Sequence, residues 1–193
     1  MKVLLVDHED SFVYNIAQAL QATGAEVITL RATRPVREAV RVDPDAVVLS
    51  PGPGSPSDRR LTGLGRSLLD RWDRERPVLG VCLGHQLVGE YYGGRVRRGY
   101  EPVHGETARI VHDGRGVFEN VRSPTTGARY HSLVVEERGL PPALEVTARD
   151  SRGVVMGLRH RERPVESVQF HPESYLTPEG PRMLSNFLRG ARR

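Results

Sequence analysis

The first half of the chain alternates between short apolar runs and helix-compatible segments, and this pattern restricts the possible folds more than any other feature. The apolar runs predict strands at residues 3–6, 26–30, 46–49 and 77–79. The segments between and after them predict helices over residues 11–23, 36–40, 61–74 and 86–92. Strands that alternate with helices form a parallel sheet with helices on both faces. Functional residues of such sheets collect beyond the carboxyl ends of the strands.

After Gly94 the pattern changes to short strand-like segments separated by turns. These segments lie at residues 107–111, 128–135, 144–148, 154–158 and 165–169, and a last helix is expected over 178–188. Turn-rich connections of this kind favour antiparallel pairing. We therefore predict an α/β fold: an open, mostly parallel, doubly wound sheet with helices on both faces and antiparallel additions in the second half. With 193 residues, the chain fits a single domain, 1–193.

Cys82, the single cysteine, lies between two glycines where a predicted strand passes into a predicted helix, in the segment Gly-Val-Cys-Leu-Gly-His-Gln. A nucleophile elbow needs this arrangement, because its tight turn admits only small residues on either side of the nucleophile. The positive end of the following helix favours a thiolate. The alternative is that Cys82 is a small buried hydrophobe, as many unpaired cysteines are.

A nucleophilic cysteine needs a base, and the base needs a group that orients it. The segment Gln-Phe-His-Pro-Glu-Ser places His171 and Glu173 at the end of a predicted strand. Pro172 favours an extended conformation at His171, so that residues two apart tend to project to one side. His171 is therefore the predicted base and Glu173 its orienting carboxylate. Without the cysteine elbow, the same segment would indicate a surface turn.

The segment Ser-Pro-Gly-Pro-Gly-Ser-Pro, residues 50–56, follows the predicted strand 46–49. Its prolines and glycines exclude regular secondary structure and give a stiff loop. A stiff backbone can direct N–H groups at developing negative charge without reorganising, as an oxyanion hole requires. The alternative is a surface turn without chemistry. The loop lacks the lysine and the glycine spacing of a phosphate-binding loop.

Together these motifs resemble one enzyme family. The segments 50–54, 80–86, 129–133 and 169–174, in this order, are similar to those of class I (triad) glutamine amidotransferases. The opening segment 6–15 resembles the small glutaminase subunits of anthranilate synthase and aminodeoxychorismate synthase. The resemblance extends from Met1 to about Leu188.

The resemblance implies a role for each matching residue. Cys82 would attack the side-chain amide carbon of L-glutamine, His171 would activate the thiol and protonate the departing ammonia, and Glu173 would orient His171. The remaining matches would bind the oxyanion or the substrate. They are the backbone amides of Gly52 and Leu83, the neighbouring loop residues Pro53 and Gly54, the Gln86 side chain, and the backbone at Ser132 and Leu133. An ordinary helix or strand-end position is the alternative for the last three.

The resemblance also implies a separate, chorismate-using synthase subunit that receives the ammonia, in a heterodimer or heterotetramer, and no cofactor in this subunit. The sequence contains no further catalytic segment that would use ammonia. We favour the anthranilate synthase subunit of tryptophan biosynthesis. The alternatives are the aminodeoxychorismate synthase subunit of folate biosynthesis, a stand-alone γ-glutamyl hydrolase-like enzyme, and a regulatory module without activity.

Composition excludes several other classes. The net charge is +4, but Lys2 is the only lysine, and the arginines are scattered among acidic residues without an aromatic stacking platform. This pattern indicates solvated helix faces rather than a nucleic-acid interface. No apolar stretch is long enough to span a membrane. One cysteine excludes an internal disulfide and suits the reducing cytoplasm, where we expect the protein to act.

The other histidines show no metal-ligand spacing, and we expect no metal site. His85 lies near Cys82, but its position in the first helical turn favours a packing role. His104 and His131 are expected to be loop or packing residues. Asp10 or Ser11 is expected to cap the first helix.

Overall fold

The computed structural model describes residues 1–99 and 105–191. Strands and helices alternate through the first half, in the order β1 (Lys2–Asp7), α1 (Val13–Gln21), β2 (Glu26–Arg31), α2 (Val36–Val42), β3 (Ala46–Leu49), α3 (Arg59–Trp72), β4 (Val78–Val81) and α4 (Leu83–Tyr91). The second half contains β5 (Arg95–Arg98), β6 (Glu106–His112), a 3₁₀ turn (Gly116–Phe118), β7 (Thr125–Arg129), β8 (Leu133–Glu136), β9 (Leu144–Asp150), β10 (Val155–His160), β11 (Val165–Val168) and α5 (Gly180–Gly190).

Among the described residues, nine strands form one sheet in the order β2-β1-β3-β4-β11-β10-β9-β6-β7, and β5 pairs with β8 in a small second sheet. The strands from β2 to β11 run parallel. The strands from β10 to β7 extend the sheet in antiparallel fashion. The predicted α/β fold with antiparallel additions is confirmed. Segment 165–169, predicted among these additions, forms β11, which pairs antiparallel with β10 but parallel with β4.

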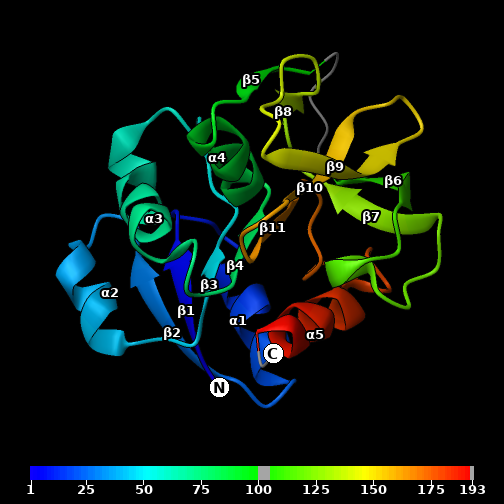
Figure 1. Cartoon of the computed structure of the whole chain (residues 1–193). Helices are drawn as coiled ribbons and strands as arrows, with labels where there is room; N and C mark the ends of the chain where they lie inside the picture. The colour runs from blue at the N-terminus through cyan, green and yellow to red at the C-terminus, as the bar shows by residue number, and fades with distance from the viewer. Residues whose placement is uncertain (100–104, 192–193) are drawn as a thin grey trace.

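Alternate residues of each parallel strand enter two different cores, which explains why these strands are apolar on both faces. Val3 and Leu5 pack with buried residues of α1 and α5. Leu4 and Val6 pack with buried residues of α2 and α3 on the other face. Figure 1 shows this arrangement, with the blue helix α1 and the red helix α5 on one side of the sheet and α2 and α3 on the other. The helices therefore hold the strands so that their carboxyl ends meet at one edge.

Two local expectations are wrong. The segment 128–135 is not one strand: β7 pairs with β6 in the large sheet, whereas β8 pairs with β5 in the small one. The first helix has no side-chain cap, since it begins at Val13 after Phe12. The Asp10 side chain accepts a hydrogen bond from the Phe12 N–H (3.0 Å), which precedes the helix. In residues 128–135, long-range strand pairing overrides the local strand pattern. Before α1, a short turn prevents the expected side-chain cap.

Within residues 1–99 and 105–191, no helix is both long and apolar enough to cross a membrane.

Candidate active site

Four neighbouring strands deliver the candidate site residues at their carboxyl ends. The strands β1, β3, β4 and β11 lie side by side in the sheet. His8 follows β1, the loop with Gly52 follows β3, Cys82 follows β4, and His171 lies shortly after β11. Residues that are far apart in the sequence are thus adjacent in space. This is the place at which open α/β sheets bind ligands.

Cys82 occupies a sharp turn between β4 and α4. It is the residue that precedes the helix, and its φ of 52° lies in the left-handed region, which is rare for a residue other than glycine. The two flanking glycines make the turn possible. A Cβ at Gly80 would lie 2.5 Å from Gly84 O, and a Cβ at Gly84 would lie 2.2 Å from Leu49 O. The strained turn presents the sulfur of Cys82, a residue that is 6% exposed, at the N-terminus of α4.

His171 is held in place by backbone and side-chain hydrogen bonds. Its N–H donates to Ala128 O (2.9 Å), and Thr177 Oγ1 donates to its carbonyl (2.7 Å). Its ring Nδ1 donates to Glu173 Oε1 at 2.7 Å, in a pair whose side chains are 5% and 2% exposed. The Nε2 atom makes no hydrogen bond to a described residue. Glu173 thus orients the ring and leaves Nε2 available.

The charge of His171 depends on both of its neighbours. Burial alone would lower the pKa of His171, but the Cys82 sulfur and the Glu173 carboxylate outweigh this effect and raise the pKa to about 10. The imidazole therefore keeps its proton near neutral pH, next to a sulfur that can carry negative charge. A protonated histidine beside a thiolate is the arrangement that a cysteine nucleophile needs.

Gln169 is a site residue that sequence reasoning missed. It is completely buried, and its Nε2 donates to Cys82 Sγ at 3.7 Å. Its Oε1 accepts from Gln86 Nε2 (3.3 Å), which also donates to Leu133 O (3.1 Å). Because a backbone carbonyl only accepts, the chain of donors runs from Gln86 through Gln169 to the sulfur. The sequence pointed to Gln169 only through its place in the segment 169–174, two residues before His171.

A cavity of about 140 Å³ opens onto the sulfur. Its walls contain Gly52, Gly54, Cys82, Leu83, Gln86, Tyr130, His131, Ser132 and Leu133. Every predicted oxyanion or substrate residue is therefore in the cavity wall except Pro53, which is exposed and does not line it. His171 and Glu173 line an adjacent cavity of about 90 Å³, and Tyr130 borders both. The Tyr130 ring packs edge-on against His171, with 5.0 Å between centroids.

The remaining histidines divide into packing and cavity residues. His85 is completely buried with Nδ1 2.9 Å from Ser167 Oγ, and burial lowers its pKa to about 3. It is neutral and packs in the interior, as expected. His131 lies buried in the loop between β7 and β8, as expected, and it also lines the cavity; burial lowers its pKa to about 4. His104 lies outside the described residues. No group of three or more potential metal ligands occurs in the described part of the chain.

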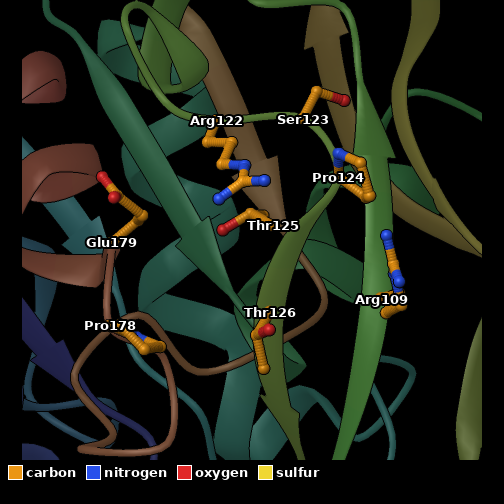
Figure 2. Close-up of a pocket in the computed structure, with 8 residues that line it drawn as sticks. All are labelled: Arg109, Arg122, Ser123, Pro124, Thr125, Thr126, Pro178 and Glu179. Carbon is orange, nitrogen blue, oxygen red and sulfur yellow. The ribbon is translucent and has the colours of Figure 1, made fainter.

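A larger pocket of about 270 Å³ lies between the β6–β7 pair and the segment that leads into α5 (Figure 2). Arg109 and Arg122 give it positive charge, and Thr125, Pro178 and Glu179 are among the residues that complete its wall. None of the triad residues borders it.

Comparison with known proteins agrees with this geometry. A family model described as "Glutamine amidotransferase class-I" matches residues 4–191. The chain is 47% identical to anthranilate synthase component 2 of Thermus thermophilus over 97% of this chain and 92% of that protein. It is 40% identical to aminodeoxychorismate/anthranilate synthase component 2 of Bacillus subtilis over 96% of this chain and 95% of that protein.

Two further relatives are much longer than this chain, and one solved structure supports only the fold. The chain spans 32% and 24% of the lengths of two multifunctional relatives. The crystal structure of a putative GMP synthase component from Thermoplasma acidophilum has the same fold, with a TM-score of 0.88 and 23% identity over 100% of this chain and 94% of that one. The match over nearly every residue, together with relatives of similar length, shows that the chain belongs to the class-I glutamine amidotransferase family.

Proposed function

We propose that this protein is the glutaminase subunit of a chorismate-using synthase, and that it hydrolyses L-glutamine to glutamate and ammonia. The observation that carries this proposal is the buried His171–Glu173 pair beside the sulfur of the strained Cys82 turn. The reaction uses only groups of the chain itself and needs no cofactor. We infer that it takes place in the cytoplasm, where a cysteine nucleophile stays reduced.

In the first half of the reaction, the Cys82 thiolate attacks the side-chain amide carbon of glutamine. The carbonyl oxygen becomes an oxyanion, which the backbone N–H groups of Gly52 and Leu83 stabilise. The protonated His171 donates its proton to the amide nitrogen, the C–N bond breaks, and ammonia leaves. The product on the enzyme is a γ-glutamyl thioester.

In the second half, His171 is neutral and acts as the base for a water molecule. Its Nε2 takes one proton while the water oxygen attacks the thioester carbon. Glu173 stabilises the imidazolium that forms again. The C–S bond breaks, and the thiolate and the protonated imidazole are restored. The second water proton remains on the new γ-carboxyl group, which releases it to the solvent as glutamate leaves.

Gln86, Ser132 and Leu133 are proposed to hold the amino-acid end of the substrate. They lie in the wall of the cavity that opens onto the sulfur. The Gln86 amide is fixed by Leu133 O and Gln169, so its orientation does not depend on a ligand. A preformed polar group of this kind fixes the substrate at little entropic cost.

The relatives favour anthranilate synthase as the assembly in which the chain works. One relative bears the name anthranilate synthase component 2, and another bears the names of both chorismate enzymes. Aminodeoxychorismate synthase is therefore the second candidate. Mixing the chain with each type of synthase subunit, glutamine and chorismate, and identifying the aminated product, distinguishes the two.

The central test replaces Cys82 by serine. We expect Cys82→Ser to abolish glutamine-dependent amination, because serine lacks the acidity and nucleophilicity of the thiol. The same complex supplied with ammonium salt should retain the amination activity of the wild type, which controls for folding and assembly. Glutamine-dependent turnover in Cys82→Ser, or failure of a glutamine-analogue electrophile to label Cys82 in the wild-type complex, would disprove the proposed function.

A further inference from the structure

His8 directly follows β1 in the sequence, and in the fold it contacts the loop that follows β3. The residue is completely buried. Its backbone N–H donates to Ser50 Oγ (3.0 Å), and its ring Nδ1 lies 2.9 Å from Ser50 O. Because a carbonyl oxygen only accepts hydrogen bonds, Nδ1 carries the proton. His8 therefore binds the first residue of the loop through both its backbone and its side chain.

The residues after Ser50 are held by a further hydrogen bond and by contact with His8. The Ser50 Oγ lies 2.6 Å from Pro51 O, to which it donates a hydrogen bond. The next residue, Gly52, rests directly on His8: a Cβ at Gly52 would lie 2.4 Å from His8 O and 2.7 Å from His8 Cβ. Gly52 is thus in close contact with His8, with no room for a side chain between them.

Of the two nitrogens of the His8 ring, Nδ1 hydrogen-bonds to the loop and Nε2 does not. The Nε2 atom is buried and has no hydrogen-bond partner among the described residues. On this side the ring faces α3, where a Cβ at Gly65 would lie 3.5 Å from Nε2. Burial lowers the pKa of His8 to about 4, so the ring is neutral near pH 7. The ring thus contributes one directed donor, and that donor points at the loop.

We propose that His8 is a positioning residue for the oxyanion hole: through Ser50 and its contact with Gly52, it holds the Gly52 N–H toward the tetrahedral intermediate formed on Cys82. This inference rests on the proposed glutaminase function. A peptide N–H that is already aimed at the developing charge needs no reorganisation during the reaction. Loss of the Nδ1 donor lets the loop relax, and the stabilisation of the transition state falls while substrate binding stays.

The test compares two substitutions of His8 with different donors. His8→Leu removes the Nδ1 donor and leaves an apolar side chain of similar size next to α3. His8→Asn retains an N–H donor at about the place of Nδ1. We expect kcat for glutamine hydrolysis to fall by about tenfold or more in His8→Leu, less than removal of an oxyanion donor itself causes. In His8→Asn it should stay within about threefold of wild type, and KM should change little in either variant.

A second measurement separates positioning from general packing. Alkylation of Cys82 by iodoacetamide needs the sulfur but no oxyanion hole, so its rate should be the same in the wild type and both variants. Equal losses of turnover and alkylation in His8→Leu would overturn the proposal, as would full turnover in that variant. If His8→Leu does not fold, Ser50→Ala removes the Oγ hydrogen bonds with His8 N–H and Pro51 O but keeps the one from Nδ1 to Ser50 O, so it should show a smaller loss of kcat, again without a loss of alkylation. Wild-type protein that hydrolyses no glutamine would instead refute the proposed function itself.

Discussion

At the scale of single residues, the Cys82 sulfur is surrounded by groups that favour negative charge on it. His171 is a protonated neighbour, and Gln169 donates an amide N–H to the sulfur. Gln169 cannot turn its amide around, because its oxygen accepts from Gln86. Gln86 in turn is fixed by a backbone carbonyl. The orientation of both side-chain amides, Gln86 and Gln169, is therefore set by the backbone carbonyl of Leu133.

Substitution of Gln169 by methionine should weaken the nucleophile. Methionine has a similar length and no N–H donor, so the sulfur loses a charge-assisted hydrogen bond that contributes roughly 1.5–3 kcal/mol. We expect kcat/KM for glutamine to fall by about 10- to 100-fold. The rate of Cys82 alkylation by iodoacetamide at a fixed pH should fall, because the thiolate loses a donor that stabilises it.

Gln86→Met is the matched control for this prediction. It removes the amide that fixes Gln169 but leaves the donor on the sulfur. The alkylation rate should therefore fall less than in Gln169→Met, whereas KM for glutamine should rise, because Gln86 lines the cavity. Identical alkylation rates in Gln169→Met and the wild type would show that the 3.7 Å contact does not act on the thiolate.

At the scale of elements, the turn between β4 and α4 depends on close backbone packing. The turn leaves no space for a side chain at Gly80 or Gly84, since Cβ atoms there would meet backbone atoms at 2.5 Å and 2.2 Å. Backbone atoms of β3, unlike side-chain ends, cannot move aside without disturbing the sheet. The helix α4 therefore lies as close to β3 as the chain permits, which brings the start of α4 near the loop that follows β3.

Gly84→Ala should destabilise the protein by about 3 kcal/mol or more, since overpacking against backbone lies at the upper end of such costs. Gly63→Ala, within α3, is the control, because a Cβ there meets nothing within 4 Å. The control should gain roughly 0.5–1 kcal/mol from higher helix propensity. Urea unfolding measures both values. A Gly84→Ala protein as stable as the wild type would contradict the close packing of the turn.

At the scale of the whole molecule, burial keeps three of the described histidines, His8, His85 and His131, in neutral form. Burial lowers the pKa of His8 to about 4, of His85 to about 3 and of His131 to about 4. In the unfolded chain these residues titrate near the ordinary value of 6.5. Between these limits the unfolded chain binds protons that the folded protein does not. Acid therefore favours unfolding in this window.

The free energy of unfolding should accordingly fall as the pH is lowered from about 6.5 to about 4, by up to about 1.4 kcal/mol per pH unit for each histidine. His171 does not oppose this trend. Its pKa is raised to about 10, so the stability it contributes is complete below 6.5 and is lost only as the pH rises toward 10. In His85→Asn the slope of the unfolding free energy against pH should decrease by the contribution of about one bound proton. Urea unfolding between about pH 4.5 and 7 measures it, and an unchanged slope would show that His85 is not buried in neutral form.

Local patterns account for the parts of the protein that could be predicted. The strand 46–49 was predicted with the bounds that the structure gives, and α2 and α3 were predicted to within two residues at either end. Apolar periodicity and the glycines around Cys82 are properties of neighbouring residues, so the sequence alone predicts them. The chain order of loop, cysteine and histidine also predicted which strand ends carry the candidate site.

The sequence by itself therefore determined the α/β alternation, the turn that holds Cys82 and the pairing of His171 with Glu173 two residues away. Only the tertiary structure decided that residues 128–135 divide between two sheets, that Gln169 reaches the sulfur, and that His8 supports Gly52. The physical reason is range. Periodicity and turn chemistry act between residues close in sequence. These contacts join residues about 15 to 90 positions apart, and whether they meet depends on how the strands are ordered in the sheet.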